Sequence, residues 1–270
     1  MRITICFLAI FIAGISSQAQ QNLVIPIETK DNALLLTTDG DKRLMVTYFG
    51  KRLTSSSEYA AIKRQTRLLD GNAGINNSAY TPSGSWSTVE PAIQVTHADG
   101  NTSLDLQYVS HNSTKKDDNV TETAILLKDP VYPFEVVLHY RTFAKENVME
   151  QWTVIRHQEK KPIVIQKMAS ANLYFYGQNF YLTHYHGTWA QEMRPEEVAL
   201  TAGIKTLDSK LGTRADMYQA PSFMVSFDKP ATENEGDVLL GTLSWSGNFR
   251  FDMEVDTYHN LRLIAGMNSY

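Results

Sequence analysis

Residues 241–255 read GTLSWSGNFRFDMEV and contain two strand-like runs joined by a turn. The first run ends at Trp245, and the second begins at Phe249. Gly247 and Asn248 between them favour the left-handed or turn conformations that a tight reversal of the chain needs. We therefore expect a turn at this place, with Trp245 anchoring the incoming strand in the protein core.

Apolar residues occur at every second position along most of the chain, which is the spacing of side chains on one face of a β-strand. Turn-forming sequences such as Asp39-Gly40, Asp99-Gly100-Asn101 and Asp129-Pro130 bound these runs. The pattern predicts an all-β fold, a large sandwich of antiparallel sheets that forms one domain over residues 20–270. The alternating sets are Leu44, Val46 and Tyr48; Leu104, Leu106 and Tyr108; Val136, Leu138 and Tyr140; Phe223, Val225 and Phe227; Leu239, Leu243 and Trp245; and Leu261 and Leu263.

Three stretches depart from the alternating pattern. Residues 54–69 are compatible with a short helix or a long loop. Residues 70–88 are rich in Gly, Asn and Ser and predict an exposed loop. Residues 112–119 are polar and predict a solvated connection between two strands of a hairpin.

Residues 1–19 are typical of a secretory signal peptide. Arg2 precedes a short apolar stretch, and Ser17-Gln18-Ala19 provides the small residues that signal peptidase recognises. We therefore expect cleavage after Ala19 and an exported protein, either periplasmic or secreted. An uncleaved anchor is the alternative, although the apolar stretch is short for a membrane span. No second apolar run approaches that length, so we expect no membrane partner.

The composition excludes several classes of function. Cys6, the only cysteine, lies in the signal peptide, so the mature chain has no thiol for catalysis or for binding metal. Removal of residues 1–19 also removes Arg2, which leaves 24 basic residues against 29 acidic ones and a net charge of −5. A mildly acidic chain without a basic tract is not expected to bind nucleic acid.

Candidate catalytic and metal-binding motifs are weak. Thr183-His184-Tyr185-His186 places two imidazoles on one face of a strand, where they could bind a metal. No third ligand is evident, so we predict ordinary polar positions and no metal. The chain contains no phosphate-binding glycine motif and no GxSxG elbow, and we predict neither a cofactor nor a catalytic residue. The acidic pairs Glu146 with Glu150 and Glu196 with Glu197 are expected to be solvated.

Aromatic residues are concentrated in one stretch. Such rings can stack on the apolar faces of sugars, or half of them can pack in the core, where aromatic rings bury much area. Composition favours the second interpretation, and stacking on a sugar is likewise the less favoured alternative for Trp245. The stretch contains Tyr174, Phe175, Tyr176, Phe180, Tyr181, Tyr185 and Trp189.

Several motifs in order resemble the bacterial α-galactosidases of glycoside hydrolase family 36. The resemblance runs from about residue 22 to the end of the sequence. It rests on Glu90-Pro91-Ala92-Ile93, His97-Ala98-Asp99-Gly100, Asp105–His111, Tyr181-Leu182-Thr183-His184 with Gly187-Thr188-Trp189 and Glu192, Gly212-Thr213-Arg214 with Pro221-Ser222-Phe223, Trp245-Ser246-Gly247-Asn248, and Ala265-Gly266-Met267-Asn268.

The resemblance implies a fold and a role. In this family the region is an N-terminal β-supersandwich, similar to galactose mutarotase, ahead of a (β/α)₈ barrel that carries both catalytic aspartates. The sequence ends at Tyr270, before that barrel, so we expect a chain without activity of its own. It would support the barrel and shape the cleft of a retaining α-galactosidase, within a possible homo-oligomer. The alternative is a free-standing carbohydrate-binding or structural module.

One loop departs from the family pattern. Many members carry an Asp and an Arg near the substrate cleft in the loop before Glu90, where this chain has Ser87 and Val89. No charged sugar contact can therefore be assigned to these two positions. Trp86, in the same loop, is the one candidate substrate-binding residue, through stacking on a sugar ring.

Overall fold

The computed structural model describes residues 23–59, 61–62, 77–84, 88–177, 179–214 and 217–269. These residues form sixteen strands, one helical turn (α1, Ser56–Tyr59) and one 3₁₀ turn (η1, Gly212–Arg214). Trp86, Ser87 and the expected signal peptide lie outside the described residues. Within the described part of the chain, no helix is long and apolar enough to cross a membrane.

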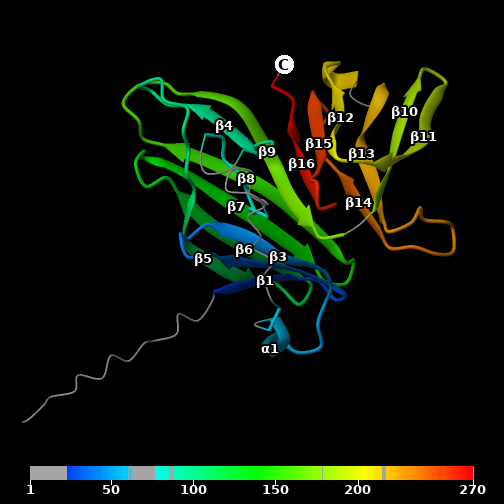
Figure 1. Cartoon of the computed structure of the whole chain (residues 1–270), viewed down its shortest axis with the longest axis horizontal. Coiled ribbons are helices and arrows are strands. Elements are labelled where there is room, and N and C mark those ends of the chain that lie inside the picture. The colour runs from blue at the N-terminus through cyan, green and yellow to red at the C-terminus, as the bar shows by residue number, and fades with distance from the viewer. Residues whose placement is uncertain are drawn as a thin grey trace, which may run out of the picture.

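The strands form four sheets in which every pairing is antiparallel, so the predicted all-β, antiparallel class is confirmed (Figure 1). The three-stranded sheet contains β1 (Val24–Glu28), β2 (Asn32–Thr38) and β3 (Leu44–Lys51). A four-stranded sheet contains β5 (Gln107–Lys115), β6 (Val120–Lys128), β7 (Phe134–Phe143) and β8 (Val148–His157).

The other two sheets contain every strand from β9 onward, together with β4. The outer sheet has the order β11 (Gln191–Leu200), β10 (Phe180–Thr188), β13 (Tyr218–Phe227) and β14 (Val238–Thr242). The central sheet has the order β12 (Gly203–Ser209), β15 (Phe249–Val255), β16 (Leu261–Met267), β9 (Val164–Phe175) and β4 (Ile93–Thr96).

The central sheet separates two hydrophobic cores. Tyr174 of β9 and Ile264 of β16 point into the first core, which also contains side chains of the β1–β3 and β5–β8 sheets. The adjacent residues Phe175 and Leu263 point into the second core, which the outer sheet covers. Because successive side chains of a strand alternate between faces, one strand can contribute to both cores. Burial on both faces makes the central sheet the structural centre of the molecule.

The alternating pattern correctly identified most of the inward side chains. Val136, Leu138 and Tyr140 of β7 are buried in the first core, and Phe223 and Val225 of β13 are buried in the second. Such side chains remove apolar surface from water, which is the main favourable contribution to folding. The positions that alternate with them carry most of the polar and half-exposed residues of these strands.

Four predictions about local structure need adjustment. The expected exposed loop over residues 70–88 is wrong for residues 77–82, which are buried, because Ala79 and Tyr80 pack in the first core. Leu104 and Leu106 are buried, but they precede β5, because the backbone N–H of Leu104 donates to Ser83 in a loop instead of to a strand. Strand β5 extends into the stretch 112–119 as far as Lys115, so only residues 116–119 form the connection to β6. The short helix expected within residues 54–69 corresponds to α1, and most of the rest of that stretch lies outside the described residues.

A core substitution tests the two-sided packing of the central sheet. Phe251 of β15 is fully buried, and its ring centroid lies 5.2 Å from that of Phe223 on the outer sheet. We expect Phe251→Ala to lower the free energy of unfolding by about 3–5 kcal/mol, because it leaves a cavity between two sheets. Chemical denaturation measures this loss. Val131→Ala, at a highly exposed position, is the control and should change stability little; equal effects would contradict the assigned core.

Candidate functional site

Asn248 connects three segments of the chain at the end of the molecule where the sequence finishes. Its side-chain oxygen accepts a hydrogen bond from the backbone N–H of Gly212 at 2.7 Å. Its backbone carbonyl accepts from the indole Nε1 of Trp245 and from the backbone N–H of Asn268, each at 3.1 Å. The turn of residues 245–248 therefore positions both η1 and the last residues of β16.

The expected position of Trp245 in the core is wrong. Strand β14 ends at Thr242, and the Trp245 side chain bends back over its own turn and remains half exposed. A Cβ at Gly247 would lie 2.7 Å from atoms of the indole ring, so glycine is required there for close approach. Gly247 and Asn248 form the expected turn, but neither has a positive φ.

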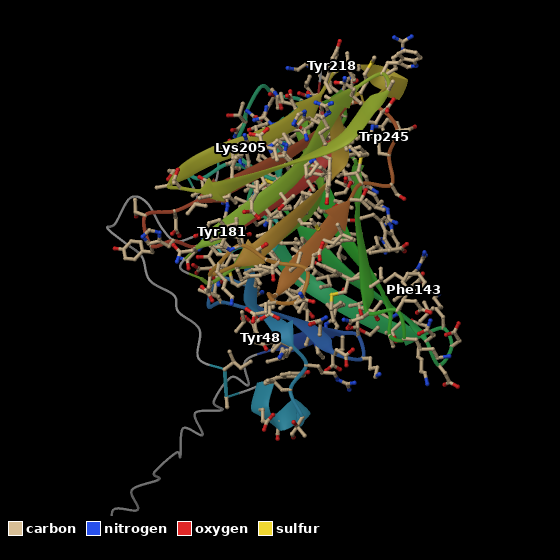
Figure 2. The ribbon with its side chains drawn as sticks, turned by 90° about the vertical axis from the view of Figure 1, so that its right-hand side faces the viewer. Tyr48, Phe143, Tyr181, Lys205, Tyr218 and Trp245 are labelled. Atoms are coloured by element: carbon tan, nitrogen blue, oxygen red, sulfur yellow. The ribbon has the colours of Figure 1, made fainter. Side chains whose placement is uncertain are left out.

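Large apolar side chains surround this turn and are exposed. Leu211 and Met267 precede the residues that bond to Asn248, and Tyr218 is the first residue of strand β13. Together with Trp245 they are 41–59% exposed, and we name these four residues the C-terminal end surface. Figure 2 shows Tyr218 and Trp245 in the same part of the molecule. A group of exposed apolar side chains is characteristic of a contact surface.

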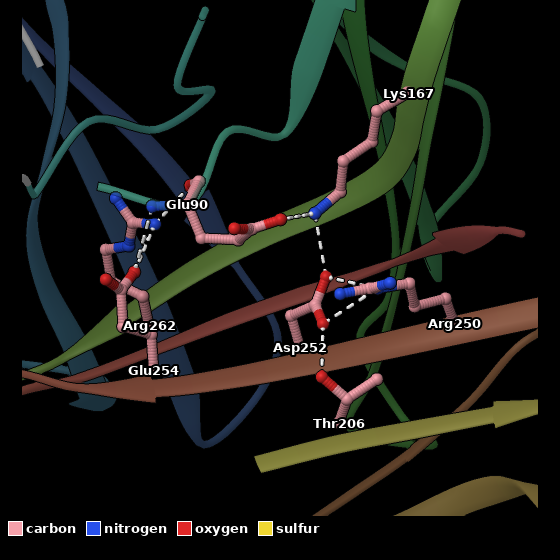
Figure 3. A network of polar contacts seen from close by, with 7 residues as sticks. All are labelled: Glu90, Lys167, Thr206, Arg250, Asp252, Glu254 and Arg262. Carbon is pink, nitrogen blue, oxygen red and sulfur yellow. Dashed lines mark hydrogen bonds and ion pairs between the residues drawn. The ribbon is translucent and has the colours of Figure 1, made fainter. Parts of the chain in front are cut away.

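A second feature is a network of charged side chains that holds Glu90 (Figure 3). The backbone N–H of Glu90 donates to the Glu254 carboxylate at 3.2 Å, and its carbonyl accepts a hydrogen bond from Arg262. The Glu90 carboxylate accepts a hydrogen bond from Lys167 Nζ at 2.5 Å. Strands β9, β15 and β16 therefore all bind this single residue.

Asp252 completes the network from the buried side. Its carboxylate accepts hydrogen bonds from Lys167 Nζ at 2.7 Å, from Arg250 Nε at 2.9 Å and from the Thr206 hydroxyl at 2.8 Å. Burial alone would raise the pKa of Asp252, but the bonds from Arg250 and Lys167 and the lysine charge outweigh it, so its pKa is below the usual value. The Asp252 side chain is therefore an ionised, fully bonded anchor.

The spacing of these two carboxylates raises the question of catalysis. Glu90 and Asp252 bond to the same lysine, which places them within roughly the 5–5.5 Å that retaining glycosidases use. One of the two groups would have to be a protonated acid, and both would have to reach the sugar. Asp252 is ionised and only 1% exposed, and three cationic or hydroxyl groups occupy its oxygens. The network therefore holds Glu90 in place, and Glu90 and Asp252 do not form a catalytic pair.

The network lies next to the loop that carries Trp86. Thr81 accepts a hydrogen bond from the backbone N–H of Ala92 at 2.8 Å, and Ser83 donates to Ile93 at 2.9 Å. Gly84 has a φ of 74°, and a Cβ there would lie 2.5 Å from the Thr102 carbonyl. These contacts close the base of the loop on both sides of the undescribed residues 85–87.

His184 and His186 lie together with a carboxylate. Their Nε2 atoms are 3.8 Å and 3.9 Å from the same oxygen of Glu196 on β11. Burial, with the nearby positive charge of Lys205, lowers the pKa of His184 and keeps its ring neutral. Among the residues that the structure describes, no group of three or more His, Cys, Asp or Glu side chains has a geometry that could hold a metal ion.

The other candidate site residues, which are the acidic pairs and the aromatic stretch, differ in how far their side chains are exposed. Glu146, Glu150, Glu196 and Glu197 are all exposed, as expected. The aromatic stretch follows the favoured interpretation, in which about half of its rings pack in the core. Tyr174, Phe175 and Phe180 are buried, Tyr176, Tyr181 and Tyr185 are partly exposed, and Trp189 is almost fully exposed at the β10–β11 turn.

The fold and these features define an all-β domain with an anchored loop and an exposed apolar end. A family model described as the glycosyl hydrolase family 36 N-terminal domain matches residues 42–270, and the chain belongs to this family.

Similar proteins are α-galactosidases. The sequence is 24% identical to α-galactosidase Mel36A of Lactobacillus acidophilus, over 93% of this chain and 37% of the relative. The α-galactosidase structure from Lactobacillus brevis has a TM-score of 0.83 at 22% identity, covering 93% of this chain and 37% of that chain. AgaA of Geobacillus stearothermophilus, in complex with raffinose, has a TM-score of 0.82 at 20% identity and covers 92% and 38%. This chain therefore spans little more than a third of the length of these relatives.

Sequence reasoning did not identify the network or the role of Asn248. A signal for the network was available, because Arg250, Asp252 and Glu254 alternate with the four apolar residues of one strand. A strand with one apolar face and one fully charged face predicts that the second face has ionic partners. Their identity could not be inferred, because Glu90 is 162 positions away from Asp252 in the sequence.

Removal of the Asp252 charge tests the network. We expect Asp252→Asn to destabilise the fold at pH 7 by about 3–5 kcal/mol, because Lys167 and Arg250 lose a buried counter-ion. A lowered folded-state pKa means that the native ion pair stabilises the fold above the unfolded-state pKa, about 3.9, and that this contribution is lost as the pH falls through the folded-state value. Denaturation at several pH values should therefore show that the free energy of unfolding of the parent falls toward that of the variant as the pH is lowered.

Asp118→Asn is the matched control for this experiment. Asp118 bonds to Lys115 at 2.7 Å, but its side chain is 93% exposed. An exposed ion pair contributes little, so this variant should keep nearly the parent stability. A loss for Asp252→Asn no greater than that for Asp118→Asn would contradict the anchoring role.

Proposed function

We propose that this chain is the non-catalytic N-terminal domain of an exported α-galactosidase that hydrolyses terminal α-galactosides. The observation that carries the proposal is the family match over residues 42–270, combined with relatives that are much longer than the matched region. One solved relative is a complex with raffinose and another is a complex with stachyose, both of which are oligosaccharides. The catalytic carboxylates would belong to the part of the enzyme that follows this domain.

We further propose that the four sheets form a β-supersandwich of the galactose mutarotase type. The central sheet supports this assignment, because it lies between two cores and the other sheets cover both of its faces. Residues 1–19 would be the signal peptide and residues 20–270 the domain, in a periplasmic or secreted enzyme. Assembly of that enzyme into a homo-oligomer is part of the same proposal.

The C-terminal end surface would contact the catalytic domain. Its four apolar residues surround Asn248, which bonds to Asn268 near the end of the sequence. A domain that follows Tyr270 directly would begin at this same end of the molecule. Covering Leu211, Tyr218, Trp245 and Met267 would then remove their exposed apolar area from water.

The loop with Trp86 would shape the rim of the substrate cleft. The Glu90 network supports this role, because it fixes the residue that follows the loop from three strands. Ser87 and Val89 stand where many family members have charged residues, so stacking by Trp86 would replace charged contacts with the sugar.

An activity assay tests the absence of catalysis. The purified chain should not hydrolyse an aryl α-galactoside, whereas a longer product encoded by the same reading frame should. We therefore expect the coding DNA to continue past codon 270 into a catalytic domain. Turnover by the chain that persists through repurification would contradict the proposal, and so would a stop codon directly after Tyr270.

The role of Trp86 is tested in the longer enzyme. We expect Trp86→Ala to raise KM and leave kcat nearly unchanged, since loss of a stacking side chain removes about 1–3 kcal/mol of binding to both substrate and transition state. Trp86→Phe keeps an aromatic ring and should retain most of the affinity. Equal kinetics for Trp86→Ala and the parent would remove Trp86 from the substrate site.

A further inference from the structure

The outer sheet has a face that the second core leaves uncovered. Phe180 and Leu182 of β10 point into the core, so Tyr181, Thr183 and Tyr185 point outward. We name this surface the outer tyrosine face. It comprises Tyr181, Thr183 and Tyr185 of β10, Ser222, Met224 and Ser226 of β13, and Val238, Leu240 and Thr242 of β14. Figure 2 views the molecule from this side, with Tyr181 labelled.

Both tyrosines lie beside strand β13. The hydroxyl of Tyr185 is 3.6 Å from the sulfur of Met224 on β13, so its ring extends along the sheet surface. Tyr181 is paired with Ser226, which is also flanked by Val238 on β14. Ser226 is buried although it belongs to the outward set. The side chains of Tyr181 and Tyr185 are both partly exposed, so part of each ring is open to a ligand.

The distance between the two tyrosine rings determines the minimum length of a ligand that contacts both. Tyr181 and Tyr185 are four residues apart on one strand, which corresponds to roughly 13 Å between them. Thr183 lies between them with its hydroxyl, and the exposed Glu197 of β11 is paired with Thr183. A ligand that contacts both rings must therefore be longer than a single sugar unit.

The charge of this surface indicates the chemistry of its ligand. None of the nine residues of the outer tyrosine face is charged, and four of them carry an aliphatic hydroxyl group. A surface with aromatic faces and hydroxyl groups, flanked by the single carboxylate of Glu197, complements a neutral sugar chain, which has apolar ring faces and hydroxyl edges. The absence of Lys and Arg at these nine positions disfavours a phosphate-bearing or otherwise anionic ligand.

We propose that the outer tyrosine face binds a neutral oligosaccharide of several sugar units. Tyr181 and Tyr185 stack on the apolar faces of two units, and Thr183 and Glu197 bond to sugar hydroxyl groups between them. Raffinose and stachyose, found in complexes of similar enzymes, belong to this chemical class. The site differs from the proposed Trp86 loop and does not depend on the catalytic role proposed above.

Affinity electrophoresis of the chain in gels that contain soluble galactomannan tests this site. Galactomannan should retard the parent chain, and excess stachyose should reverse the retardation. Tyr181→Ala combined with Tyr185→Ala should weaken retardation at least tenfold, while the corresponding double Phe variant keeps both rings and should retain binding. Tyr258→Ala is the control, because Tyr258 is an exposed tyrosine in the turn after β15. Circular dichroism confirms that each variant is folded.

Three outcomes would overturn the proposal. The parent could show no retardation by galactomannan, or the double Ala variant could be retarded as strongly as the parent. The third outcome is that a second copy of the chain occupies this face. Sedimentation would then show a dimeric parent and a monomeric double Ala variant, and the two proteins would bind galactomannan equally well.

Discussion

The burial of strand β15 on both of its faces is the constraint from which the other features follow. Phe249, Phe251 and Met253 fill the second core, so Asp252 must lie on the opposite face, where it is also removed from water. A buried carboxylate is tolerated only when its oxygens are bonded, preferably to cations. Arg250 and Lys167 meet this need, and the same lysine then binds Glu90. One packing requirement thus connects the central sheet to the base of the Trp86 loop.

The start of β15 organises the other end of the molecule in a similar way. Asn248 immediately precedes the strand, and its three hydrogen bonds hold Trp245, Gly212 and Asn268. These contacts hold the loops close to the sheet, while the large apolar side chains of Leu211, Trp245 and Met267 remain exposed to solvent. The proposed domain contact and the anchored loop are therefore both attached to the central sheet, in which β15 and β16 are almost completely buried. A rigid centre with two supported surfaces suits a domain that positions parts of a larger enzyme.

Sequence reasoning recovered the parts of the fold that depend on local periodicity. The alternation of Val136, Leu138 and Tyr140 requires only that one face of a strand be buried, and it identified both the strand and its inward side. The same parity argument failed for Trp245, because β14 ends at Thr242 and the alternation of faces stops with the strand. The pairing of Glu90 with Glu254 joins positions far apart in the chain, which no local pattern contains. The family could be predicted from sequence motifs that resemble family 36, whereas the anchoring network could be found only in the structure.

Hydrogen exchange of this domain, alone and within the longer enzyme, tests the account most directly. The account predicts that the backbone amides of residues 209–214 and 243–248 exchange more slowly in the proposed longer enzyme, because the C-terminal end surface would be covered there. The amides of β15 and β16 should exchange slowly in both proteins, since these strands are already buried. Unchanged exchange at residues 209–214 and 243–248, with new protection elsewhere on the domain, would contradict the proposed arrangement.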